Sequence, residues 1–223
     1  MSSCQPPDPT HHFALKYQAR RAAKKKFGPV HGLPLARRAS SLLLEHARDQ
    51  MRVLEVGAGD RRMKDHLQRK YPGIRYESLD PDPEGPHDYR RWDQVPEGYD
   101  LIFAFEVLEH IPAKQLPEFL WQMQRRLRPG GVLLLSTPNV YCPHRYLYDA
   151  THCTPLCYDE LAGLVELSGL EVQAIYRTYH EPWLRKVVRR WLFGWLFRLL
   201  MLDYAPQIVL VARKAVVPSR QAA

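Results

Sequence analysis

The chain has 223 residues, of which 45% are hydrophobic and 11% aromatic. This length and composition predict one globular domain whose core needs no disulfide or metal staple, and they exclude an intrinsically disordered protein. The formal net charge is +8, and the segment from Lys16 to Arg38 alone carries eight Lys or Arg and no acid. Such a basic block suits nucleic acid, anionic lipid or an acidic substrate, although a solvated helix face is the commoner explanation.

The first twelve residues, Met1 to His12, are polar, contain three prolines and lack the apolar stretch of a secretory signal peptide. Four cysteines in a chain of this length fit a reducing compartment better than a disulfide framework. We therefore expect a cytoplasmic protein. Residues 1–32 are predicted to form a basic N-terminal tail and arm, residues 33–214 the folded domain, and residues 215–223 a C-terminal tail.

The basic arm is predicted to hold a helix up to Phe27, and a second helix is predicted over Leu35 to Arg48. The latter leads to an apolar run, Val53 to Gly59, which contains an acid and ends in two glycines (Val-Leu-Glu-Val-Gly-Ala-Gly). A buried strand followed by a glycine turn lets a ligand approach main-chain atoms that a Cβ would block. A dinucleotide fingerprint has a third glycine at the position of Arg62. The run therefore predicts a nucleotide-type cofactor without a pyrophosphate, with a plain tight turn as the alternative.

Strands alternate with helices through the rest of the chain, which is typical of an α/β fold with a mostly parallel sheet and helices on both faces. The predicted strands after Val53 are Ile74 to Leu79, Asp100 to Phe105, Val132 to Ser136, Leu170 to Tyr176 and Gln207 to Val211, with a short strand considered at Tyr89 to Asp93. The predicted helices are Met63 to Tyr71, Leu116 to Leu127 and Tyr158 to Ser168.

An acid follows the second of these strands directly. Asp80 lies 21 residues beyond Gly59, which is where an acid accepts hydrogen bonds from the hydroxyls of a ribose. Asp82 competes with it, because Asp-Pro-Asp-Pro can also form a simple turn. Farther on, Trp92 or Asp93 is expected near an adenine.

A basic amphipathic segment precedes the last strand. Apolar residues recur in pairs every four positions from Trp183 to Leu202, and five basic residues but no acid lie between Pro182 and Leu202. The pattern predicts a helical insertion in the domain, too short and too charged to span a bilayer. It is open to peripheral contact with a membrane, to covering a hydrophobic acceptor, to pairing with a second subunit, or to packing on its own domain.

Four motifs together resemble the class I S-adenosylmethionine-dependent methyltransferases, from about Leu35 to Lys214. They are Leu54-Glu-Val-Gly-Ala-Gly59, Asp80, Tyr99-Asp-Leu-Ile leading to Glu106-Val-Leu-Glu-His110, and Leu127-Arg-Pro-Gly-Gly-Val-Leu-Leu-Leu-Ser-Thr-Pro-Asn139. The resemblance implies a Rossmann-like three-layer sandwich whose mostly parallel seven-stranded sheet ends in an antiparallel strand. It also implies S-adenosylmethionine as the cofactor.

The resemblance further implies a role for individual residues. In the glycine turn around Ala58, the residues Glu55, Gly57 and Gly59 are expected to contact the methionine part of the cofactor. Asp80 is expected at the ribose, Asp93 in the surroundings of the adenine, and Glu106 near the amino acid group. The family often has another glycine shortly after Gly59, whereas this chain continues Asp60-Arg61-Arg62. The path of that loop is the part that the resemblance does not fix.

A candidate metal site follows the central strand. Glu106, Glu109 and His110 stand at i, i+3 and i+4, so a helical turn there would place them on one face. Two carboxylates and an imidazole suit Mg²⁺, Mn²⁺ or Zn²⁺, and His152 is a candidate fourth ligand. This arrangement is similar to the ExxEH motif of metal-assisted O-methyltransferases, among them the ubiquinone-pathway enzymes and the small-RNA terminal 2′-O-methyltransferases. The alternatives are a general base or positioning role for His110, and a purely structural one.

We therefore expect O-methylation of a small, lipidic or glycan hydroxyl acceptor, with Glu109, His110 and His152 as the residues that carry the chemistry. The methyl donor is already reactive, so the protein has to align the acceptor and remove its proton. One alternative is an RNA 2′-O-methyltransferase, favoured by the basic arm. Another is a partner protein that keeps the fold without catalysis.

Overall fold

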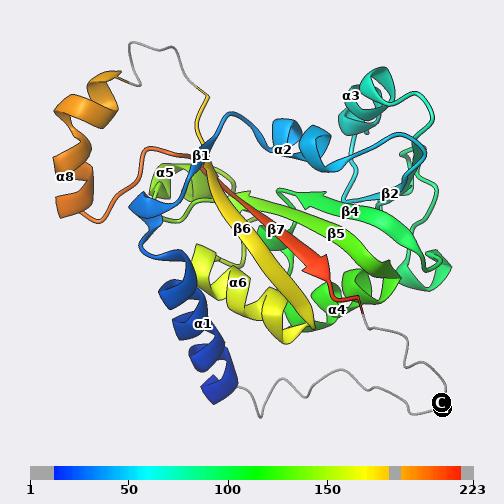
Figure 1. The fold of residues 1–223 in the computed structure, drawn as a ribbon, viewed down its shortest axis with the longest axis horizontal. Coiled ribbons are helices and arrows are strands. Elements are labelled where there is room, and N and C mark those ends of the chain that lie inside the picture. Colours follow the sequence, from blue (N-terminus) through cyan, green and yellow to red (C-terminus); the bar gives the residue numbers. More distant parts are fainter. Residues whose placement is uncertain (1–12, 181–186, 217–223) are drawn as a thin grey trace.

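The computed structural model describes residues 13–180 and 187–216. Its centre is a seven-stranded sheet in the order β1-β6-β7-β5-β4-β2-β3 (Figure 1). Strand β7 runs antiparallel to both of its neighbours, β5 and β6, and the other neighbouring pairs are parallel. The predicted fold class, including the antiparallel last strand, is confirmed.

The strands are β1 (Leu35–Ala36), β2 (Arg52–Val56), β3 (Arg75–Leu79), β4 (Tyr99–Phe105), β5 (Leu127–Pro138), β6 (Leu170–Thr178) and β7 (Gln207–Lys214). The α-helices are α1 (Phe13–Phe27), α2 (Ala39–His46), α3 (Arg62–Lys70), α4 (Leu116–Arg126), α5 (Pro143–Leu147), α6 (Tyr158–Leu167) and α8 (Gly194–Leu199). Short helical turns are η1 (Val30–Gly32), η2 (Trp92–Gln94), η3 (Leu108–His110) and η4 (Val188–Leu192).

Two apolar cores lie on the two faces of the sheet, because successive residues of a strand point to opposite sides. In β4, Leu101 and Phe103 face the core that α2 and α3 cover, and Ile102 and Ala104 face the core under α1, α4 and α6. All four side chains are fully buried. A strand buried on both faces reads as a continuous apolar run, which is why this strand was recognisable from sequence.

The N-terminal side of the domain differs from prediction. The helix predicted over Leu35 to Arg48 is wrong at its start: Leu35 and Ala36 form β1, which pairs with Arg177 and Thr178 of β6, and α2 begins only at Ala39. The strand considered at Tyr89 to Asp93 is also wrong. Tyr89 makes one isolated bridge to Leu79, and the chain then turns into η2.

The basic arm is a helix docked on the domain. Ala23 of α1 is fully buried, and α1 lies along α6 (Figure 1). Arg20 Nε donates to the Asp159 carboxylate at 3.0 Å, and Lys26 Nζ donates to the Val172 carbonyl at 2.8 Å. Gly163 permits this approach, since a Cβ there would stand 2.9 Å from the Arg20 backbone nitrogen. Two of the basic side chains of the arm, Arg20 and Lys26, therefore make contacts within the domain.

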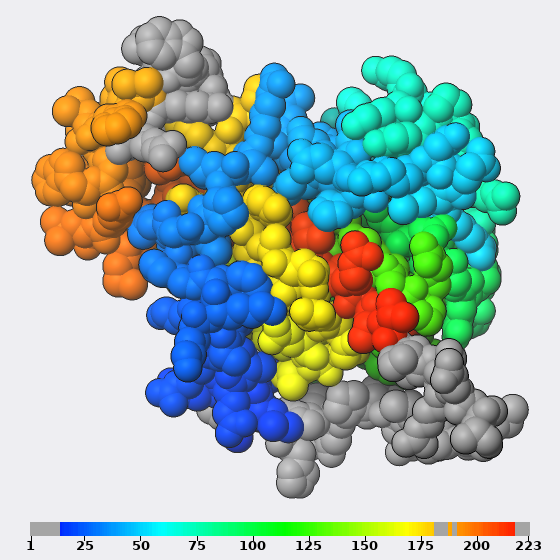
Figure 2. All heavy atoms as spheres, viewed as in Figure 1, coloured from blue at the N-terminus to red at the C-terminus, as the bar shows by residue number. Residues whose placement is uncertain are grey.

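Part of the predicted amphipathic segment, 183–186, lies outside the described residues. From Val188 onward the segment forms two short helices, η4 and α8, with Phe193 between them. They project at one end of the molecule, where they are coloured orange in Figure 2. Among the described residues, no helix combines the length and the hydropathy that a bilayer crossing requires.

Candidate functional site

A cleft of about 440 Å³ opens at the carboxyl ends of β2, β3 and β4. The chain runs from β2 outward to β3 and then returns to the other side of β2 as β4, so the strand order reverses here. Open α/β sheets bind ligands at such a reversal. The cleft is lined by Val56, Gly57, Leu79, Pro81, Arg90, Arg91, Trp92, Glu106, Val107, His110, Ile111 and Phe119.

Gly57 brings bare backbone to the cleft. Its φ of +69° lies in the left-handed region, and its N–H donates to the Leu79 carbonyl at 2.8 Å. A Cβ added there would stand 2.4 Å from Cγ2 of Val107, which also lines the cleft. Glycine is therefore required both by the turn and by the close packing of Val107 against it.

Asp80, which is expected at the ribose of a cofactor, contacts the glycine turn. Asp80 Oδ2 accepts a hydrogen bond from the Gly59 N–H at 2.9 Å, and its Oδ1 accepts one from the Asp82 N–H at 3.0 Å. Ala58 is buried between the two glycines. The Asp80 side chain is not among the residues that line the cleft, but its neighbours Leu79 and Pro81 are. Its carboxylate thus lies at the cleft's edge, holding the turn.

The loop after Gly59 is held by Arg61. Arg61 adopts a φ of +58°, and its guanidinium donates to the Pro86 carbonyl and, at 3.2 Å, to the Asp88 carboxylate. It also lies over the Tyr76 ring. These contacts offset the backbone strain that a non-glycine residue carries in this region.

Glu55 points away from the cleft. Its side chain is 6% exposed and accepts a hydrogen bond from the Tyr76 hydroxyl on the face covered by α2 and α3. Burial raises the pKa of this carboxyl to about 7, and the nearby Asp60 adds to the shift. The structure therefore places Glu55 beneath the glycine turn, at a distance from the open cavity that Gly57 lines.

The raised pKa of Glu55 makes stability fall with pH. The unfolded chain releases the proton near pH 4.5, whereas the folded chain holds it until about pH 7. Between these values unfolding releases a proton, so the free energy of unfolding falls by about 2–4 kcal/mol as the pH rises through the window. Glu55→Gln keeps an acceptor for Tyr76 and should reduce the difference in stability between pH 5 and pH 8 by this amount in urea denaturation; buried Glu109, whose pKa is also raised, keeps its own contribution. Glu45→Gln, at an exposed position of α2, should leave the difference unchanged; an unaltered difference in Glu55→Gln would contradict the assignment.

Glu106 lies in the cleft wall but outside the expected helical turn. Its φ is +55°, and η3 begins only at Leu108. Glu106 Oε1 accepts hydrogen bonds from Ser136 Oγ at 2.9 Å and from Gln207 Nε2 at 2.7 Å. The carboxylate is thereby held toward β5 and β7. Asp93, in η2, is exposed and paired with Arg91, while its neighbour Trp92 lines the cleft and meets Phe119 edge-on at 5.4 Å.

Three of the four predicted metal ligands come together. Glu109, His110 and His152 offer ligand atoms that all lie within 4.8 Å of one another. Glu106 is not in this group. Glu109 is fully buried, and neither of its carboxylate oxygens has a hydrogen-bond partner among the described residues. Burial raises its pKa to about 8, and the nearby Glu106 carboxylate adds to the shift. An unpartnered buried carboxylate is costly, and a cation would compensate it.

Both His110 and His152 use Nδ1 in a hydrogen bond within the domain, so Nε2 is the nitrogen that remains for a possible ligand. His152 Nδ1 is 2.7 Å from the Tyr146 carbonyl, which only accepts, so Nδ1 carries the proton. Thr151 Oγ1 donates to Asp149 at 2.7 Å, so it accepts from His110 Nδ1 at 2.9 Å. In the neutral form of each ring the lone pair is then on Nε2, and His152 Nε2 lies 3.9 Å from Glu109 Oε1. Hydrogen-bond acceptors on Nδ1 orient the histidine ligands of metal sites in this way.

His110 is the residue shared by the two parts of the site. It is exposed, lines the cleft, and stacks edge-on with His152 at 4.8 Å between ring centroids. An imidazole with a free Nε2 at this position can accept a proton from a group bound in the cleft, or it can ligate a cation beside it. Either chemistry acts on a ligand in the same cleft.

Several residues of the site were missed by sequence reasoning. Val107 and Phe119 wall the cleft, and Gln207 holds Glu106 from a strand about a hundred positions away. Apolar residues on a strand end or a helix stripe look like core, so they carry no separate signal. Thr151 and Asp149 could have been found from sequence, because they place a hydroxyl and an acid beside the candidate ligand His152.

Comparisons with known proteins agree with this geometry. A family model described as "Methyltransferase domain" matches residues 31–175. A curated protein of Mycolicibacterium smegmatis, named as a probable S-adenosylmethionine-dependent methyltransferase, is 34% identical over 94 residues, which are 41% of this chain and 36% of that protein. The match thus covers well under two thirds of that relative.

Solved structures share the fold. A SAM-dependent methyltransferase of Archaeoglobus fulgidus superposes with a TM-score of 0.62 at 17% identity, covering 93% of this chain and 100% of the other. Haemonchus contortus phosphoethanolamine N-methyltransferase 2, solved with S-adenosyl-L-methionine, gives 0.52 at 12% identity over 89% and 53% of the two chains. With a family model that spans most of the chain and a glycine-lined cleft at the strand reversal, this protein belongs to the methyltransferase-domain family of S-adenosylmethionine-dependent methyltransferases.

Proposed function

We propose that this methyltransferase methylates a hydroxyl group on a small, lipidic or glycan acceptor, with a divalent cation held by Glu109, His110 and His152. The observation that carries the proposal is the position of His110, which lines the cofactor cleft and also belongs to the three-residue cluster. A hydroxyl acceptor needs to lose its proton, and the cluster offers a base and a cation position at the cleft wall.

The residues of the cleft fit S-adenosylmethionine. When bound, this cofactor supplies an activated methyl group. Gly57 presents its backbone to the cleft, Asp80 stands at the edge expected for the ribose, and Trp92 with Phe119 provides an apolar wall that excludes water. Glu106 lines the cleft, and its carboxylate, held in place by Ser136 and Gln207, suits a cationic ammonium group.

The cluster fits a divalent cation. Two imidazole nitrogens and one carboxylate favour Mn²⁺ or Zn²⁺ over Mg²⁺, which prefers oxygen ligands. With three protein ligands, further coordination positions remain for an acceptor. A cation there would lower the pKa of an acceptor hydroxyl. His110 and His152 are oriented for this role through Thr151 and the Tyr146 carbonyl.

Gly57→Ala is expected to weaken S-adenosylmethionine binding at least about tenfold, because the new methyl group would stand 2.4 Å from Val107 Cγ2 and would displace this residue of the cleft lining. Isothermal titration calorimetry measures the affinity. Gly28→Ala is the matched control, since Gly28 has a similar φ of +76° but no atom within 4 Å of an added Cβ. Equal binding by the two variants would contradict this placement of the cofactor.

The proposed function is tested by transfer of a labelled methyl group into fractionated cell extract, with and without a chelator. We expect label in a lipid, glycan or small-molecule fraction, stable to conditions that remove labile esters. The chelator should abolish transfer, and Mn²⁺ or Zn²⁺ should restore it. Label in RNA would favour the 2′-O alternative. Transfer that is unaffected by the chelator would remove the cation from the proposal, and absence of S-adenosylmethionine binding would favour the non-catalytic alternative.

A further inference from the structure

The α8 surface, which we define as residues 187–202, exposes large apolar side chains. Trp191 is 79% exposed, Trp195 65% and Leu199 70%. This density of exposed apolar side chains on one short segment is unusual for a surface that faces only water. The segment contains Arg189, Arg190 and Arg198 and no acidic residue.

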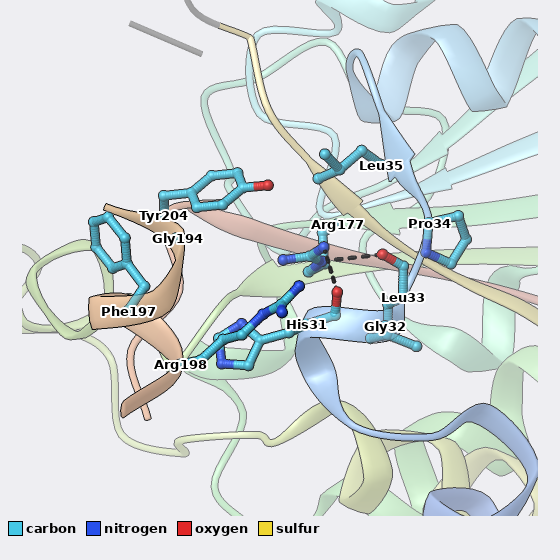
Figure 3. Close-up of a pocket in the computed structure, with 10 residues that line it drawn as sticks. All are labelled: His31, Gly32, Leu33, Pro34, Leu35, Arg177, Gly194, Phe197, Arg198 and Tyr204. Carbon is cyan, nitrogen blue, oxygen red and sulfur yellow. Dashed lines mark hydrogen bonds between the residues drawn. The ribbon is translucent and has the colours of Figure 1, made fainter. Parts of the chain in front are cut away.

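Two cavities adjoin this surface and share Phe197. One, of about 300 Å³, is wholly apolar and is lined by Val188, Phe193, Leu196, Phe197, Leu200 and Leu202. The other, of about 320 Å³, lies between α8 and the chain leading into β1, and Figure 3 shows His31, Arg177, Arg198 and Tyr204 around it. Phe197 meets the Tyr204 ring edge-on at 6.0 Å, which fixes α8 to the wall between the cavities.

The polar cavity carries one uncompensated positive charge. The Arg177 guanidinium is paired with Asp203 at 2.8 Å. It also donates to the carbonyls of Leu33 and His31 at 3.1 and 3.0 Å (Figure 3). Arg198 is exposed, and no hydrogen bond or ion pair joins its guanidinium to another described residue. No carboxylate is among the residues that line the cavity. The Arg198 charge is therefore available to an anion.

A cationic cavity beside an apolar one fits a ligand with an anionic head and an apolar chain. We propose that the α8 surface docks on an anionic lipid bilayer, with a headgroup phosphate at Arg198 in the polar cavity and an acyl chain in the apolar cavity. Exposed tryptophans next to arginines are the composition of segments that lie in the membrane interface. The proposal concerns binding and goes beyond the methyl transfer proposed above.

A second copy of this chain fits the surface less well than a bilayer. A two-fold dimer would set the same face against itself, and the segment has three arginines but no acid to pair with them.

Docking on a bilayer also has a geometric consequence. The polar cavity lies beyond the end of β6 and before the start of β7. Both strand ends lie at the end of the sheet where the parallel strands have their carboxyl termini, and the cofactor cleft opens at this same end. The bilayer would therefore contact the protein at the end of the sheet where methyl transfer is proposed.

The test is flotation of the full chain with vesicles of phosphatidylcholine, alone or mixed with phosphatidylglycerol. We expect the protein to float only with the anionic vesicles. Arg198→Gln should lower the partition coefficient about fivefold, and Trp191→Ser with Trp195→Ser should lower it at least about tenfold. All three positions are exposed, so the fold should be retained, which circular dichroism verifies. Arg69→Gln is the matched control: an exposed arginine on α3, on the far side of the molecule (Figure 1).

Four outcomes would overturn the proposal. In the first, the protein stays unbound with anionic vesicles. In the second, Arg198→Gln weakens binding no more than Arg69→Gln. In the third, the protein forms a dimer that the two tryptophan substitutions dissociate. In the fourth, it binds inorganic phosphate at Arg198 but does not bind vesicles. The assay contains neither methyl donor nor acceptor, so failure of the proposed function would leave its result unchanged.

Discussion

His110→Gln is expected to lower kcat by about 10²–10⁴-fold while S-adenosylmethionine affinity changes little. Glutamine can form hydrogen bonds, but it cannot accept a proton near neutral pH and is a weak ligand for Mn²⁺ or Zn²⁺. Steady-state kinetics with titration calorimetry separates the two effects. Equal losses of kcat and of cofactor affinity would show that His110 shapes the cleft without taking part in chemistry.

Two further variants isolate the role of His110. His66→Gln changes an exposed histidine of α3 and should leave kcat unaltered. Thr151→Val removes the acceptor for His110 Nδ1–H, so the ring loses the contact that fixes its orientation. We expect a loss of about 10–100-fold in kcat or in metal affinity, and recovery in Thr151→Ser, which keeps the hydroxyl.

Asp203→Ala is expected to destabilise the protein by about 3–5 kcal/mol, because it leaves the Arg177 guanidinium buried without a counter-charge. Both side chains are almost fully buried, and Asp203 also accepts hydrogen bonds from Asn139 Nδ2 at 2.8 Å and the Tyr204 N–H at 2.8 Å. One carboxylate thus ties β6, the end of β5 and the approach to β7 together. Chemical denaturation measures the loss.

The control is an exposed ion pair of similar geometry. Arg125 and Glu97 lie 3.0 Å apart with both side chains about half exposed or more, so Glu97→Ala should cost only about 0–1 kcal/mol. Replacing both members of the buried pair, as Arg177→Met with Asp203→Ala, should destabilise less than Asp203→Ala alone. If the double variant is the less stable one, the cost arises from lost packing and not from the unpaired charge.

The fold was predictable where side-chain pattern and burial coincide. The runs at Val53, Asp100 and Val132 are central strands covered on both faces, so nearly every residue is apolar and the elements read clearly. β1 gave no such signal, because two residues at the sheet's edge carry no periodicity. Its pairing with Arg177 and Thr178 depends on a segment about 140 positions later.

The site was predictable as far as local spacing determines it. Asp80 reaches Gly59 because strand ends of neighbouring parallel strands meet, and Glu109 lies beside His110 because they are adjacent in sequence. Glu106 lies outside the predicted helical turn because its backbone is left-handed. No residue pattern predicts that conformation for a glutamate. Glu55 points inward because it lies on the same face of β2 as Val53, which packs in the core under α2 and α3. The next residue, Val56, points to the other face of the sheet and lines the cleft.

The docking of α1 on α6 sets an order of assembly during synthesis. Arg20 and Asp159 are 139 positions apart, so the first helix leaves the ribosome long before its binding surface exists. Until then its apolar side is exposed, and closing so large a loop is slow compared with forming local helices. The first helix of the chain is therefore among the last to be secured, and a chain interrupted before Asp159 would carry it undocked, open to proteases and chaperones.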